Sequence, residues 1–194
     1  MSEAAAGNRD TIGRAFLTDA RQRFESIKTS AERAAAQVND EQFFQPLDED
    51  GNSIALLMKH MSGNLESRFT DFLTSDGEKP TRDRDGEFVR EAGDTRETIA
   101  ERWERGWSAL WGALDSLSAG DLLKTVRIRG EPHTVVQALL RQVAHQSMHA
   151  GQVIILAKHY AGAKWETLSI PRGKSKEFGA KMTEKQGKGG SSKR

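Results

Sequence analysis

Two histidines, His145 and His149, lie four residues apart in a segment predicted to be helical. Residues i and i+4 project from the same helix face, so both imidazoles could bind one metal ion. From Gln142 to Ala157 there is no Asp, Glu, Lys or Arg, although charged residues make up 29% of the chain. A face without charges indicates a covered surface, so we expect both rings to point into the protein. The alternative is a pair of buried histidines that hydrogen-bond to neighbouring helices.

A third histidine, His60, lies beside the apolar stripe of an earlier predicted helix. On its own it would be an ordinary core or boundary residue. Helix axes roughly 8–10 Å apart would let it reach the same ion as His145 and His149. Three neutral nitrogen ligands leave at least one coordination position open, as catalytic sites do. Such an ion could lower the pKa of a bound water, or bind a thiol as thiolate.

The other two histidines fit this centre less well. At 1.5 Å per residue, His159 lies roughly 15 Å beyond His149 along the helix, and His133 lies roughly 18 Å before His145. Gln142 and Gln152 flank the pair and could orient the ligands or contact a substrate. Ordinary buried hydrogen bonds are the alternative for both glutamines.

The elements that must position these side chains follow from apolar periodicity, which predicts four long helices. Carboxylate or hydroxyl caps are expected at Asp94-x-x-Glu97 and Thr134-x-x-Gln137, and Gly162 should stop the last helix. The third helix carries three tryptophans at i, i+4 and i+8, which predicts bundle core or a dimer seam, or one of them, such as Trp107, lining a pocket. The predicted helices span residues 8–38, 53–74, 94–117 and 135–160.

Two connections differ from ordinary short loops. Residues 76–93 form a polar link that is long for a compact bundle, and its alternating Arg and Asp predict a local lattice of surface ion pairs. Residues 122–129 form a short irregular or extended segment before the last helix. After that helix, residues 165–170 carry apolar anchors that predict a strap packed against the body.

Charge divides the chain into two parts. From Arg172 onward the chain has eight Lys or Arg and two Asp or Glu, a net charge of +6, which leaves −5 for residues 1–171 of the total +1. We therefore expect one domain over residues 1–175 and a disordered basic tail over 176–194. An acidic body disfavours nucleic-acid binding, because such domains gather Lys and Arg on one face.

Composition excludes several classes of protein. The chain has no cysteine, so disulfides, thiolate metal sites and a cysteine nucleophile are excluded. Residues 1–10 lack the apolar core of a secretory signal, and no apolar run reaches the roughly 18 residues of a membrane span. These features predict a soluble, cytoplasmic protein that is not bound to a membrane.

Several motifs, taken together and in order, resemble a subfamily of unknown function within the DinB-like (DinB/YfiT-type) proteins. The second predicted helix contains Leu-Met-Lys-His-Met-Ser-Gly-Asn at 57–64 and Ser-Arg-Phe-Thr-Asp-Phe-Leu at 67–73. The following loop contains Asp-Gly-Glu-Lys-Pro at 76–80 and Arg-x-Arg-Asp-x-Glu-Phe at 82–88. The last helix and strap contribute His-Thr-Val at 133–135, Arg-Gln-x-x-His-x-x-x-His-x-Gly-Gln at 141–152 and Leu-Ser-Ile-Pro-Arg-Gly-Lys-Ser at 168–175. The chain departs from the family pattern at Phe69 and Thr81, where tryptophan is expected.

The resemblance implies an all-α, four-helix bundle with up-down-down-up order, often a homodimer. It also implies a divalent metal ion, zinc or nickel foremost, held by His60, His145 and His149. Members of the wider superfamily include transferases and isomerases that use bacillithiol, mycothiol or glutathione, and some hydrolases. Asn64, Trp107, Gln142 and Gln152 are the candidate substrate-binding residues.

Two functions follow as hypotheses. The first is a metal-dependent transferase that acts on a small-molecule substrate with a low-molecular-weight thiol. The second is a non-catalytic dimeric bundle in a stress response, in which the ion is structural or sensory. The sequence shows no acid next to the histidines on their own helix that would serve as a general base.

Overall fold

The computed structural model describes residues 3–189, and the side chains of residues 10–184. It is mostly helical, as predicted, with one small sheet. The long helices are α1 (Glu3–Ala35), α3 (Ile54–Phe69), α4 (Arg96–Ser116) and α5 (Val135–Ala161), and a further helix, α6 (Ser175–Gly189), follows them. The short elements are α2 (Asp40–Phe44), the 3-10 turns η1 (Gly86–Phe88), η2 (Ala119–Asp121) and η3 (Gly162–Lys164), and the strands β1 (Thr125–Ile128) and β2 (Glu131–Thr134).

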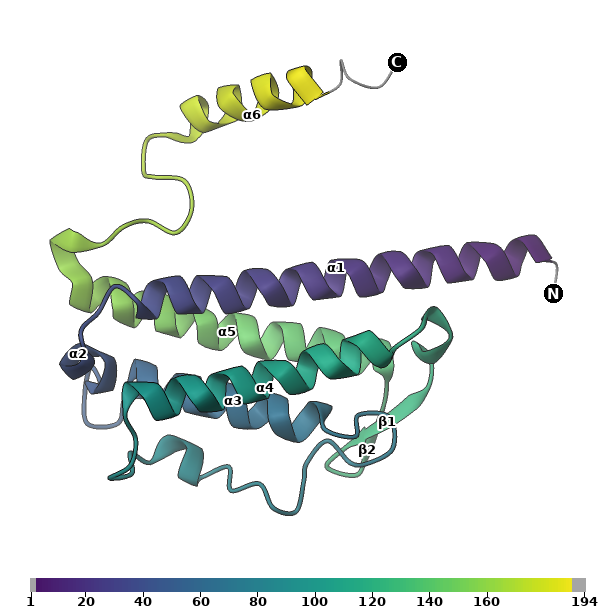
Figure 1. Cartoon of the computed structure of the whole chain (residues 1–194), viewed down its shortest axis with the longest axis horizontal. Helices are drawn as coiled ribbons and strands as arrows, with labels where there is room; N and C mark the ends of the chain where they lie inside the picture. Colours follow the sequence, from purple (N-terminus) through teal and green to yellow (C-terminus); the bar gives the residue numbers. More distant parts are fainter. Residues whose placement is uncertain (1–2, 190–194) are drawn as a thin grey trace.

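The four long helices lie side by side as a bundle with up-down-down-up order. Figure 1 shows α1 running in one direction, α3 and α4 both running back, and α5 returning alongside α1. Because α3 and α4 are parallel, the segment between them, residues 70–95, must travel the length of the bundle. We call these residues the crossover segment.

The interface between α1 and α4 has an apolar centre with polar contacts at its edges, where Lys28 pairs with Glu104 and Trp103 Nε1 donates to Glu32. Phe24 and Trp107 are fully buried and meet edge to face, with ring centroids 6.4 Å apart. Trp103 and Trp111 pack on either side of Trp107. The tryptophan stripe predicted on the third helix is therefore part of the core, where aromatic side chains bury the largest apolar area.

Parallel packing of α3 on α4 depends on a close approach at Gly106. A Cβ at this position would come within 2.6 Å of the Ser62 carbonyl oxygen. Glycine therefore lets the two helix backbones approach more closely than any other residue would allow.

The helix ends differ from the predictions in two places. α3 ends at Phe69 rather than near residue 74, and Asp71 adopts a φ of 50° as the chain turns away. α4 is capped by Thr95 with Thr98 rather than by Asp94 with Glu97, because the Asp94 carboxylate accepts hydrogen bonds from Lys59 and the Glu91 N–H instead.

The segment before α5 is a β-hairpin. β1 and β2 pair antiparallel, with Thr125 opposite Thr134 and Ile128 opposite Glu131. The turn between them places Arg129 and Gly130 at φ of 57° and 78°, the two positive values of a tight hairpin turn. The predicted extended segment is confirmed, whereas its partner strand, which contains Pro132, was not predicted. The predicted cap of Thr134 with Gln137 is confirmed.

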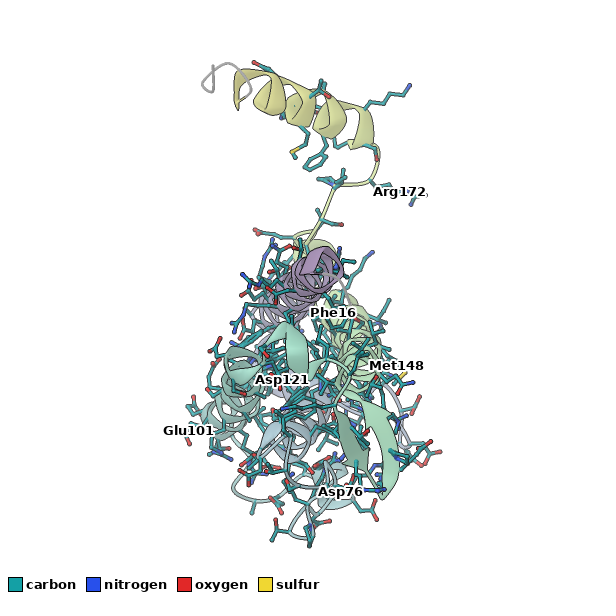
Figure 2. The ribbon with its side chains drawn as sticks, turned by 90° about the vertical axis from the view of Figure 1, so that its right-hand side faces the viewer. Phe16, Asp76, Glu101, Asp121, Met148 and Arg172 are labelled. Atoms are coloured by element: carbon teal, nitrogen blue, oxygen red, sulfur yellow. The ribbon has the colours of Figure 1, made fainter. Side chains whose placement is uncertain are left out.

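The last part of the chain leaves the bundle. Trp165 and Leu168 pack against the core as predicted for the strap, whereas Ile170, its third predicted anchor, is exposed. Gln37 exchanges two hydrogen bonds with the Glu166 backbone. Residues 176–189, predicted to be disordered, are helical in α6, which stands apart from the bundle with its described side chains exposed (Figures 1 and 2). An isolated helix of this length is marginal in water. None of the described helices has the length and hydropathy needed to cross a membrane.

Candidate metal centre

His60 on α3 meets His145 and His149 on α5 inside the bundle. One ring nitrogen from each residue can be chosen so that all three lie within 4.8 Å of one another. The Nε2 atoms of His60 and His145 are 3.3 Å apart. His60 is 3% exposed and His149 is 9% exposed, while His145 is half-buried. The convergence predicted for the three imidazoles is therefore present.

Burial keeps two of these imidazoles neutral. It lowers the pKa of His145 to about 3, with a further contribution from the neighbouring His149 and His60. Burial also lowers the pKa of His149, although a hydrogen bond to Gln152 opposes this effect. A metal ion binds the neutral imidazole, so these side chains have lone pairs available at neutral pH.

Glu87 fixes the orientation of His60. The His60 Nδ1–H donates to Glu87 Oε2 over 2.8 Å, and the Phe88 ring packs against the imidazole with centroids 4.4 Å apart. Burial alone would raise the pKa of Glu87, but hydrogen bonds from His60 and Arg82 outweigh it and lower that pKa. An ionised Glu87 accepts a hydrogen bond from the His60 Nδ1–H, which leaves the Nε2 lone pair facing His145.

Arg82 holds Glu87 in turn. Its Nε and Nη2 donate to the two carboxylate oxygens over 2.8 Å each, which is the bidentate geometry preferred by arginine. The Arg82 side chain is only 5% exposed. Glu78 continues this chain of alternating charges, since it lies 3.4 Å from Arg82, 2.8 Å from Arg68 and 3.1 Å from Arg129. The crossover segment is thereby joined to α3 by the largely buried Arg68–Glu78 pair and to the hairpin by the Arg129–Glu78 pair, whose arginine is 55% exposed.

Gln152 performs a similar task for His149. The His149 Nδ1–H donates to Gln152 Oε1 over 2.8 Å, so its Nε2 is left as the acceptor nitrogen. The predicted role of Gln152 as an orienting residue fits this contact. His145 differs, because its buried Nδ1 has no hydrogen-bond partner among the described residues.

These observations fit a bound metal ion. Three ring nitrogens converge from two helices, two of these rings have the opposite nitrogen already engaged, and the third ring carries an unsatisfied buried nitrogen. Imidazole nitrogens suit zinc, nickel and copper. Three protein ligands leave at least one coordination position for a further molecule.

The remaining predicted residues lie elsewhere. Asn64 and Gln142 are buried and hydrogen-bond to each other across α3 and α5, one turn from His60 and from His145 respectively. Trp107 is fully buried in the core, where its ring neighbours are Phe24, Trp103 and Trp111. Asn64 and Gln142 therefore tie the two ligand-bearing helices together, whereas Trp107 packs against α1.

Sequence reasoning missed Glu87, Arg82 and Phe88 as parts of the centre. It assigned the charges of the crossover segment to a surface lattice, whereas Arg82 and Glu87 are buried. The length of this polar segment was the available signal, because a long link in a compact bundle indicates a function. Gln146 was also missed: it is fully buried one residue after His145, and its amide donates to the Met61 carbonyl.

The chain is thus a four-helix-bundle protein with a histidine triad between α3 and α5. Residues 11–174 match the model of a family described as protein of unknown function (DUF1572), and the chain belongs to that family. No functionally curated protein gives a significant match to the chain.

Proposed function

We propose that this protein binds one divalent metal ion, zinc or nickel, through His60, His145 and His149. The observation that carries the proposal is the convergence of one nitrogen from each ring within 4.8 Å. The supporting contacts are the hydrogen bonds from His60 to Glu87 and from His149 to Gln152, which fix which nitrogen of each ring is free. Both contacts are of the kind that orient metal-binding histidines.

The protein's own residues would prepare this site for chemistry. The Glu87 carboxylate holds the His60 proton away from the ion, and Arg82 keeps that carboxylate ionised and in place. His145 is half-buried, so a small molecule could approach the centre from its side. The metal, when bound, would supply a Lewis acid that polarises water or stabilises a thiolate.

The activity that we propose is transfer to or from a low-molecular-weight thiol, with a small-molecule acceptor. It is supported by the open coordination position and by the resemblance of the helix and loop motifs to DinB-like proteins. A thiol sulfur is a soft ligand suited to an ion held by imidazoles. The ionised Glu87 would then be the group near the reaction that can accept a proton, because each histidine would give one nitrogen to the ion and carry a proton on the other.

One observation favours the alternative of a non-catalytic homodimer. Three large apolar side chains of α5, Leu140, Met148 and Ile155, are exposed by 55%, 57% and 63%, and the last two lie in its charge-free stretch (Met148 is labelled in Figure 2). A second copy packed on this face would cover them. In that case the ion would stabilise the fold or act as a sensor.

Metal content tests the first part of the proposal. The purified wild-type protein should contain about one divalent ion per chain, as three converging histidines require. His149→Ala should remove most of it. His159→Ala is the matched control, because this exposed histidine of α5 lies outside the triad, and its metal content should equal that of the wild type. Equal metal in His149→Ala and the wild type would refute the site.

Turnover tests the second part. Metal-loaded protein is mixed with glutathione, bacillithiol or mycothiol and the electrophile monochlorobimane, and conjugate formation is followed by fluorescence. Conjugation that depends on thiol, on metal and on His149 supports the transferase. One ion per chain with no conjugation by any thiol favours the non-catalytic dimer, which sedimentation would then detect.

A further inference from the structure

A cavity lies between α3, α4 and the crossover segment, and none of the three histidines of the candidate metal centre lines it. Its volume is about 540 Å³, within the range of small-molecule sites. Its lining is polar, with hydroxyl, ammonium, guanidinium and carboxylate groups. The lining residues that bear on ligand binding are Lys59, Glu66, Lys79, Arg82, Glu87 and Arg105.

Small residues on one face of α3 create this space. Gly63 and Ser67 face the crossover segment and Ser62 packs against Gly106 of α4, at positions where larger apolar side chains would fill the gap. At Gly63 even a methyl group is excluded, because a Cβ would lie 2.3 Å from the Glu87 carboxylate. Ser62 and Ser67 donate to the carbonyls of Met58 and Gly77, so their hydroxyls are engaged and the hollow is structurally supported.

The floor of the cavity carries charges that are already balanced. The Lys59 ammonium donates to Asp94, Glu91 and the Val89 carbonyl, which uses all three of its protons. Arg82 is engaged by Glu87 and Glu78. These cations therefore shape the floor but have little capacity left for a ligand.

Two cations in the walls of the cavity, Lys79 and Arg105, can still bind an anionic ligand. Among the described residues, Lys79 Nζ donates to the Asp76 carbonyl and has no ion pair within 4 Å, although the Asp71 and Asp76 carboxylates attract it from further away. Burial lowers the pKa of Lys79, as expected for an ammonium whose charge is poorly matched. Arg105 approaches its nearest acid, Glu66, at only 4.0 Å. The hydroxyls of Thr70 and Thr81 lie at the exposed rim.

We propose that this cavity binds a small molecule carrying a carboxylate or phosphate group, held between Lys79 and Arg105. An anion placed there would meet Lys79, which has no ion pair within 4 Å in the described part of the chain, and Arg105, whose pair with Glu66 is long at 4.0 Å, together with the rim hydroxyls. Both anion types accept charge-assisted hydrogen bonds from ammonium and guanidinium groups. The charged groups of this site come from the crossover segment and α4, and none of them is a candidate metal ligand.

The two sites share one residue. Glu87 contacts His60 with Oε2, and the same carboxylate forms part of the cavity floor. A ligand in the cavity would therefore lie next to the group that orients a candidate metal ligand, without touching the histidines. Binding of the anion does not require a metal ion, so this proposal can fail or succeed independently of the proposed function.

The test is calorimetric titration of the full-length, metal-free protein at constant ionic strength, with inorganic phosphate in one arm and succinate in the other. Saturable binding of either probe is expected, and the tighter of the two identifies the anionic group preferred. Lys79→Met and Arg105→Met should each weaken binding by roughly tenfold or more, because each removes a charge-assisted hydrogen bond. Lys164→Met removes an exposed cation outside the cavity and should leave binding unchanged.

A second variant separates a real site from diffuse attraction. Thr70→Trp would fill the rim of the cavity while keeping every charge, and Thr70 is exposed, so the fold should tolerate it. Binding should be lost in this variant. The proposal is refuted if neither probe binds saturably, if Lys79→Met and Lys164→Met weaken binding equally, or if Thr70→Trp binds as well as the wild type.

Discussion

The two halves of the bundle contrast in what they bury. On one side, α1 and α4 meet through Phe24, Trp103 and Trp107, and neither helix contributes a buried polar residue among the side chains described, 10–184. On the other side, α3, the crossover segment and α5 bury charges, amides and imidazoles. These buried polar residues are Ser53, Lys59, His60, Ser62, Asn64, Ser67, Arg68, Glu87, Asp94, Gln142, Gln146 and His149.

This contrast indicates that the two halves of the bundle have different roles. Burying ion pairs costs desolvation energy, and apolar replacements of similar volume are often as stable or more so. Stability alone does not require a polar half of this size. We infer that the apolar half supplies the stability of the fold, while the polar half holds side chains in positions that a binding site needs. The predictions below test this division.

The largest effect is expected in the apolar half. Trp107→Ala should lower the free energy of unfolding by about 3–5 kcal/mol, because it empties a fully buried aromatic site. Trp111→Ala, on the same helix but half-buried, should cost less. Chemical denaturation measures both changes. Metal bound per folded chain should stay at the wild-type value, and its loss from folded Trp107→Ala would contradict the division.

The next largest effect is expected on the stability of the polar half as the pH is lowered. Because the pKa of His145 is about 3 when folded and ordinarily near 6.5, the unfolded chain binds more protons between these values. Stability should therefore decrease as the pH falls from about 6.5 toward 3. The melting temperature of metal-free protein should decrease by several degrees from pH 7 to 5.

A matched pair of variants tests whether His145 causes the dependence of melting temperature on pH. His145→Gln should flatten the dependence of melting temperature on pH, while the exposed His159→Gln should retain it. Equal slopes in the two variants would show that groups other than His145 produce the pH dependence.

Glu87→Gln should weaken metal binding by roughly 10–100-fold, because it removes the charged acceptor that orients His60. The amide keeps the size of the side chain, so the bundle should remain folded. Titration with zinc in competition with a chromophoric chelator measures the affinity. Glu101→Gln, an exposed change on α4 (labelled in Figure 2), is the control and should bind like the wild type.

The smallest effect is expected for Gln152→Ala. Gln152 is exposed, and its single contact with the centre is the hydrogen bond from His149, so water can replace it. We expect a decrease in metal affinity of only a few-fold, of the order of one neutral hydrogen bond. A loss of metal affinity as large as that of Glu87→Gln would show that the Gln152 contact orients His149 as strongly as Glu87 orients His60.

The fold was largely predictable because periodicity and caps act locally. The apolar stripes gave the four helices, and the Thr134 cap and the Gly162 stop placed the ends of α5. The cap of α4 was misplaced because Asp94 is drawn to Lys59, a partner 35 residues away. Competition of this kind between local capping and tertiary contacts is not visible in the sequence.

The candidate centre was predictable only in part. Spacing on one helix linked His145 to His149, and the family resemblance supported His60. Glu87 could not be assigned, because its distance from His60 depends on the path of the crossover segment through space. Trp107 was a candidate for the pocket because helical periodicity identifies a buried face without showing which neighbour covers it.

The up-down-down-up order also has a consequence for the time course of folding. His60 and His145 are separated by 85 residues, and Glu87 reaches His60 only when the intervening chain has doubled back along the bundle. A ribosome-bound chain that ends before α5 lacks two of the three imidazoles, whatever helices it has already formed. Loading with an ion would thus report that the chain through α5 has been made and that the bundle has closed.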